Sequence, residues 1–148
     1  MKKLIFTCLS VIVLALSSCD PADQYPISFK VNGSAWYANA APTYLVSGKI
    51  LINATSITQG QNPIAFSLTQ YAMVDTFELD SANNAFLFGA SLGSGYYAKA
   101  HHPATIIIKE FNPSDKHIVA EFYGHIFNSS SNDSVLITDG KFDLHYQE

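Results

Sequence analysis

The sequence predicts an all-β fold, specifically an antiparallel β-sandwich of about nine strands connected mostly by hairpins. Three observations support this prediction. Apolar and polar residues alternate in several short segments, which is the period of a strand with one buried face. Turn residues separate these segments at intervals of roughly 8–14 residues, and no segment sustains a helical period. The chain also contains ten Phe, eight Tyr and one Trp, a composition that favours strands over helices.

The predicted strands begin with a hairpin. Apolar and polar residues alternate over residues 27–31, Asn32-Gly33 is a turn signal because both residues tolerate a positive φ, and residues 35–38 form the return strand. The longest predicted strand is 117–128, with Phe122 on one face and Tyr123 on the other. The remaining strands are predicted within 44–56 (one or two strands, bending at Gly48), 64–69, 73–79 (a strand or a turn), 85–89, 96–100, 105–111 and 135–146, the last with a bulge at Asp139-Gly140.

A closed, calycin-like barrel is the alternative fold. The same short strands and hairpin links suit a barrel as well as a sandwich. A closed barrel of the calycin type would enclose a central apolar pocket of a few hundred Å³, whereas a sandwich would not.

The N-terminal residues have the pattern of a bacterial lipoprotein signal. Lys2 and Lys3 precede an apolar run over residues 4–16, which is shorter than the roughly 20 residues of a membrane-spanning helix. The run ends in Leu16-Ser17-Ser18-Cys19, small residues followed by a cysteine whose thiol would take a diacylglycerol. An ordinary secretory signal that happens to end near a cysteine is the alternative. We therefore expect a signal helix and lipoprotein signal peptide over 1–18, a lipidated N-terminus and tether over 19–26, and a single β domain over 27–148.

The composition indicates what stabilises the domain and which kinds of partner it is not expected to bind. Cys8 would leave with the signal peptide, so the secreted domain must be held by apolar packing rather than by a disulfide. The formal net charge is −4, all basic residues are lysine, and two of them lie in the signal peptide. A chain of this charge is not expected to bind nucleic acid or to dock electrostatically on anionic lipid. The membrane partner is expected to be reached through the N-terminal lipid alone.

Three segments of the chain carry motifs that occur together in a known family. Residues 29–38 contain a phenylalanine, an Asn-Gly turn and a tryptophan, and residues 135–143 contain the pattern I-T-x-G-x-F. Residues 120–124 are similar to a G-T-F-x-G strand, with Ala120 in place of the first glycine. Together these segments resemble the opening, closing and intervening strands of a family of small Bacteroidetes lipoproteins built on a β-rich domain of unknown function. The resemblance implies a β fold and an outer-membrane lipoprotein, with the periplasmic or surface face left open. It implies no catalytic residue.

Paired aromatic residues are the candidate binding surface. Three pairs, Trp36-Tyr37, Tyr96-Tyr97 and Phe122-Tyr123, each place one ring on each face of a strand, so that one ring serves the core and its neighbour faces outward. Trp36, Tyr37, Tyr96 and Tyr97 are the residues assigned to the possible surface. Exposed Tyr and Trp rings can bind a glycan or an envelope protein. The alternative is a sandwich with one incompletely covered face.

Two short motifs are candidate modification sites. Asp80-Ser81-Ala82 and Asp133-Ser134-Val135 are similar to the Asp-Ser/Thr-apolar pattern of O-glycosylation in such bacteria. Both lie in segments that the sequence predicts as loops, so we expect Ser81 and Ser134 to be possible acceptors.

The sequence predicts no catalytic residue, metal site or cofactor. The five histidines lack metal-binding spacings such as H-E-x-x-H, and His117 and His125 would lie about 26 Å apart along one strand. The glycine-rich segment 89–95 has no helix after it to bind phosphate. We therefore expect a non-catalytic binding or structural role in the cell envelope. A carrier of small apolar ligands and an envelope enzyme acting on glycans are the alternatives.

Overall fold

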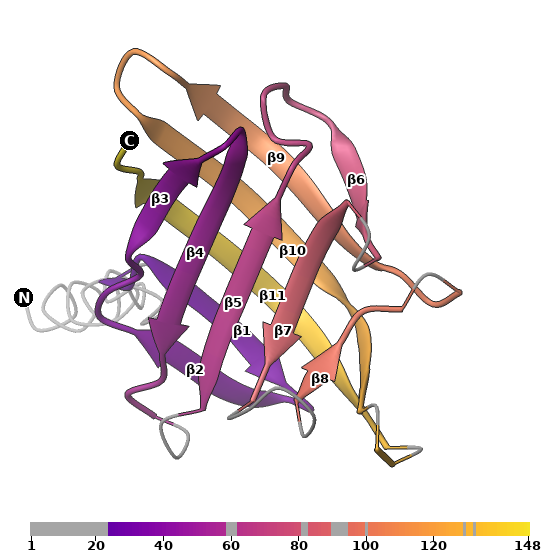
Figure 1. Ribbon diagram of the computed structural model, residues 1–148. Coiled ribbons are helices and arrows are strands. Elements are labelled where there is room, and N and C mark those ends of the chain that lie inside the picture. The colour runs from indigo at the N-terminus through magenta and orange to yellow at the C-terminus, as the bar shows by residue number, and fades with distance from the viewer. Residues whose placement is uncertain are drawn as a thin grey trace, which may run out of the picture.

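The computed structural model describes residues 24–58, 62–80, 83–89, 95–99, 101–128, 130–131 and 133–148. Its strands form one antiparallel sheet that curls into a half-barrel (Figure 1). This confirms the prediction of an all-β antiparallel fold. The predicted signal helix and residues 19–23 of the predicted tether lie outside the described residues.

The eleven described strands follow the sequence pattern closely. Residues 44–56 contain two strands, which meet at a Ser47-Gly48 turn where both residues have positive φ. Residues 73–79 contain a strand rather than a turn. The strands are β1 (Ile27–Val31), β2 (Ser34–Ala38), β3 (Thr43–Val46), β4 (Lys49–Thr55), β5 (Pro63–Leu68), β6 (Thr76–Leu79), β7 (Asn84–Phe88), β8 (Tyr96–Tyr97), β9 (Ala104–Asn112), β10 (His117–Asn128) and β11 (Ser134–His145).

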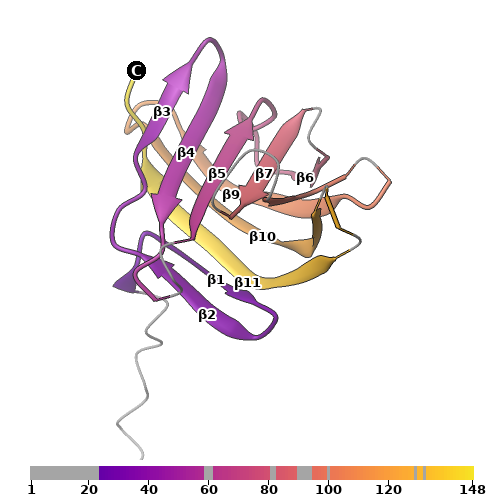
Figure 2. The same ribbon diagram turned by 60° about the horizontal axis from the view of Figure 1, so that its bottom comes forward.

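The strand order is β2-β1-β11-β10-β8-β7-β5-β4-β3, with β9 on β10 and β6 on β9. Figure 2 shows the succession β2, β1, β11 and β10 along one half of the sheet. In Figure 1 the strands β4, β5 and β7 cross in front of β10 and β11. The two halves therefore face each other although they belong to one hydrogen-bonded sheet.

The single sheet differs from the predicted sandwich of two sheets, and β10 is the reason. Residues 117–123 of β10 pair with β9, whereas Phe127 and Asn128 pair with β8. This one twelve-residue strand therefore connects the hydrogen bonding of one half of the sheet to that of the other. The β3 edge is covered in part by the C-terminal segment, because Leu45 N–H donates to the Gln147 carbonyl at 2.6 Å and Gln147 N–H donates to the Thr43 carbonyl at 2.9 Å.

Aromatic rings fill the space between the two halves. The ring centroid of Phe66 on β5 lies 5.0 Å from that of Phe122 on β10 and 5.7 Å from that of Phe142 on β11. Phe29 on β1 meets Phe86 on β7 at 6.2 Å. These rings are almost fully buried, and each such ring contributes roughly 1.5–3 kcal/mol of burial free energy. They occupy the interior in which a calycin-like carrier would hold its ligand.

A β-bulge interrupts β11 where the sequence predicted one. The register of β11 shifts against β1 between Ser28 and Lys30 and against β10 between Phe122 and Gly124. Asp139 has φ +53° at this point. Bulges bend a strand and change the direction of its side chains. This bulge lies under the surface groove described next.

Candidate functional site

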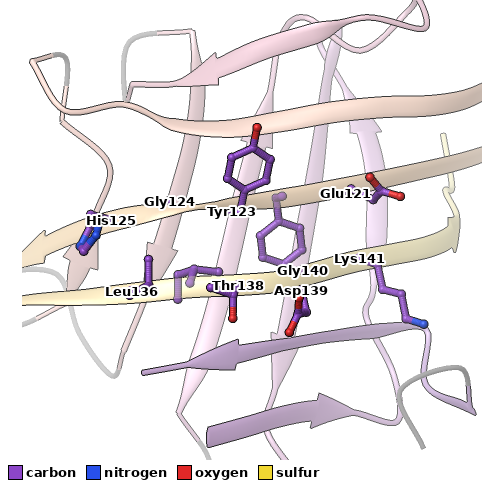
Figure 3. Close-up of a pocket in the computed structure, with 11 residues that line it drawn as sticks. Glu121, Tyr123, Gly124, His125, Leu136, Thr138, Asp139, Gly140 and Lys141 are labelled. Atoms are coloured by element: carbon purple, nitrogen blue, oxygen red, sulfur yellow. The ribbon is translucent and has the colours of Figure 1, made fainter. Parts of the chain in front are cut away.

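A shallow groove of about 820 Å³ crosses the outer face of β10 and β11. Tyr123 is 49% exposed and Leu136 is 38% exposed, whereas their chain neighbours Phe122 and Ile137 are buried in the core. Figure 3 shows the Tyr123 ring standing on β10, with Glu121 and Lys141 toward one end of the groove and His125 and Leu136 toward the other. The side chains on the outer face are those of Glu121, Tyr123, His125, Leu136, Thr138, Asp139 and Lys141.

Two glycines shape the backbone beneath the groove. A Cβ on Gly124, which has φ +139°, would lie 2.7 Å from Ala104 Cα on β9. A Cβ on Gly140 would lie 2.6 Å from Cδ2 of the Phe122 ring. Glycine at both positions allows β9, β10 and β11 to approach closely beside the bulge.

The charges of the groove are paired with charges from flanking strands. Glu121 Oε2 lies 2.9 Å from Lys109 Nζ on β9, and Asp139 Oδ2 lies 2.9 Å from Lys30 Nζ on β1. All four side chains are about half exposed or more, so each pair stabilises the fold by no more than about 1 kcal/mol. The pairs matter more for the site, because both carboxylates of the groove already have a cationic partner.

The structure places two of the predicted aromatic residues on β2, with different environments. Trp36 is fully buried and stacks on Phe29 with ring centroids 4.5 Å apart, and its indole N–H donates to the Asn62 carbonyl at 3.2 Å. Tyr37 is half-buried and stacks on Tyr25 at 4.8 Å. The expectation that Trp36 belongs to an exposed surface is therefore corrected, because its ring is part of the core.

The other two predicted aromatic residues lie on β8, which is separated from β2 by three strands in the sheet order. The Tyr96 hydroxyl donates to Asp133 Oδ2 at 2.6 Å, and this hydrogen bond raises the pKa of Tyr96. Tyr97 lines a separate concavity of about 380 Å³ on β4, β5 and β7. The structure thus does not bring Trp36, Tyr37, Tyr96 and Tyr97 together in one surface.

The remaining predicted site residues are placed as follows. Cys19 and Ser81 lie outside the described residues. Ser134 is half-buried and is the first residue of β11, where it pairs with Phe127 instead of lying in the predicted loop. Its backbone N–H donates to Asp133 Oδ1 at 2.9 Å.

His117, the first residue of β10, links three strands through its side chain. His117 Nε2 lies 2.6 Å from Asp143 Oδ1 on β11, and His117 Nδ1 lies 3.3 Å from Glu110 Oε1 on β9. The His145 ring lies beside it, with centroids 4.7 Å apart. The hydrogen bond to Asp143 is the largest cause of the raised pKa of His117. In the described part of the chain, no group of three or more His, Cys, Asp or Glu side chains is suited to hold a metal ion.

Because His117 bonds to two carboxylates, we expect the free energy of unfolding to fall as the pH rises. Because the folded pKa of His117 is raised above its unfolded value of about 6.5, its contribution is complete below that pH and is lost as the pH rises through the folded pKa. Urea unfolding from about pH 6 to pH 9 should show this loss in the wild type and a flatter profile in His117→Gln. The exposed His101→Gln should retain the wild-type profile, and an unchanged profile in His117→Gln would contradict the assignment.

The sequence places Tyr123 on the face opposite Phe122 and makes this pair one of three candidate aromatic pairs, although Tyr123 is not among the four residues assigned to the possible binding surface. The alternation in the long strand was a sufficient signal for its exposure. Leu136 and Thr138 could not be added in the same way, because the β10–β11 register that brings them beside Tyr123 depends on the bulge.

Comparisons with known proteins add no family to these observations, because no family model, curated protein or solved structure matches the chain. Across the residues that the structure describes, no helix has the length and apolar character needed to cross a bilayer.

Proposed function

We propose that this protein is a lipid-anchored binding domain of the cell envelope and that the Tyr123 groove is its ligand site. The single observation that carries the site is the half-exposed Tyr123 ring in a groove with polar side chains on both sides. A tyrosine ring offers an apolar face and a polar tip, which makes it an effective contact residue when it is exposed in a concavity.

The anchor in this proposal is Cys19. The two lysines, the apolar run and the Ser17-Ser18-Cys19 ending support it, and the outer membrane is the proposed location. The tether that follows would end at Tyr25 and Pro26, where Asp143 N–H donates to the Pro26 carbonyl at 3.0 Å. We also propose that the two halves of the curled sheet act as the layers of a sandwich, with the rings of Phe66 and Phe122 in contact between them.

Binding is favoured over the two alternative functions. A carrier of small apolar ligands needs an internal cavity, whereas Phe66, Phe122 and Phe142 occupy the space between the halves. An enzyme of the groove would rely on Glu121 and Asp139, which are each ion-paired to a lysine. A binding role requires neither a cavity nor a free carboxylate.

The test is a Tyr123→Ala variant. We expect its retention by isolated cell-envelope material to fall about tenfold or more, which is the effect of removing a central aromatic contact. Co-sedimentation of the detergent-solubilised full-length protein would measure this. Tyr44→Ala is the matched control, because Tyr44 on β3 is 42% exposed and does not line the groove. Equal retention of the Tyr123→Ala and Tyr44→Ala variants would show that the groove is not the site.

A further inference from the structure

A second concavity borders the Tyr123 groove. This concavity has a volume of about 220 Å³ and shares Glu121 and Lys141 with the groove. Its lining includes Val119, Asp143 and Tyr25, the last of which precedes β1. The two concavities together form a trough on the outer face of β10 and β11, with Tyr123 in one part and Tyr25 in the other.

The trough presents few charges that lack a partner. Glu121 pairs with Lys109, and Asp139 pairs with Lys30. Asp143, at the end near Tyr25, pairs with His117 at 2.6 Å. Lys141 also interacts with a neighbouring group. An ionic ligand would have to compete with these internal pairs, whereas an uncharged ligand would leave them intact.

Most main-chain groups along the trough are already paired in the sheet. β10 is paired with β11 on one edge and with β9 and β8 on the other, and β11 is paired with β1 and β10. These two strands therefore offer an added peptide no long run of unpaired main-chain groups. Recognition must use rings and side-chain oxygens.

We infer that the ligand is an uncharged glycan chain that lies along the trough from Tyr123 to Tyr25; this inference rests on the proposed function. The C–H face of a sugar ring would pack on Tyr123. Its hydroxyl groups would donate to Glu121 and Asp139, because a carboxylate that is paired with one lysine retains acceptor positions. The Thr138 hydroxyl can both donate and accept. No covalent step is involved.

The experiment is isothermal titration of the detergent-solubilised full-length protein. The uncharged probes are maltohexaose, cellohexaose and xylohexaose, and the charged probe is hexagalacturonate. We expect at least one uncharged chain to bind, with an affinity that is the same at about 50 mM and about 500 mM NaCl. Tyr123→Ala should weaken this binding about tenfold or more, and Tyr44→Ala should not.

Chain length tests the extent of the trough. Tyr25→Ala should weaken binding of the hexasaccharide and leave binding of the corresponding disaccharide unchanged, because only the longer chain reaches both tyrosines. Equal effects on both lengths would overturn the extended trough.

Two results would overturn the glycan inference. The first is binding of hexagalacturonate alone, weakened by salt, which would leave the groove as a binding site for a charged ligand. The second is no binding of any uncharged probe. The proposed function is tested separately by the retention assay. If the groove is a binding site, the loss of envelope retention in Tyr123→Ala would be seen in either case.

Discussion

A Gly140→Ala variant is expected to lose about 3 kcal/mol of unfolding free energy, the upper part of the range for overpacked cores. A Cβ at this position would clash with the carbonyl oxygen of Phe122 and would lie 2.6 and 2.7 Å from Cδ2 and Cε2 of its ring. The carbonyl belongs to the neighbouring strand, and the ring is held between the two halves of the sheet. Neither can move away without disturbing the β10–β11 ladder or the core.

Gly48→Ala is the matched control for this prediction. Gly48 has φ +74° and lies in the β3–β4 turn, where a new Cβ would have nothing within 4 Å. Its loss should be about 1 kcal/mol, from the positive φ alone. Urea unfolding followed by the fluorescence of Trp36, the only tryptophan and fully buried, measures both variants. Losses of the same size would show that the contact between Gly140 and Phe122 is not tight.

The sequence predicts most of the strands because each has its own apolar alternation. β5, for example, buries Ile64, Phe66 and Leu68 and leaves the residues between them half-buried. The joining of the two halves into one sheet could not be predicted in this way. It depends on which strands share the two ends of β10, and pairing partners that are distant in sequence leave no local pattern.

The position of Trp36 could have been predicted more sharply. A two-residue Asn32-Gly33 turn fixes the hairpin register, in which Phe29 is directly opposite Trp36. Directly opposed residues point to the same face of a sheet, so a core Phe29 implies a core Trp36. Chain alternation then assigns Tyr37 to the outer face, where its ring stacks on Tyr25. The hairpin register therefore shows which of the two rings faces the core, whereas the adjacency of Trp36 and Tyr37 shows only that they face opposite sides.

A Cys19→Ala variant is expected to lose all incorporation of labelled palmitate. Under the proposed function, the Cys19 thiol carries the diacylglycerol and the new N-terminus carries a further acyl chain. Each buried methylene group contributes roughly 0.8 kcal/mol to membrane affinity, and one chain alone gives only marginal binding. Durable attachment therefore needs the several chains that depend on Cys19.

Cys8→Ala is the control for this variant, because Cys8 is the only other cysteine and lies in the apolar run of the proposed signal peptide. It should retain full labelling. The label is a sharper measurement than membrane fractionation, because an uncleaved precursor would keep the apolar run of residues 4–16 and remain at the membrane without any lipid. Label that persists in Cys19→Ala would remove the anchor from the proposed function. It would leave the groove at Tyr123 to be judged by its own variants, since the ring and the ion pairs beside it belong to the β domain alone.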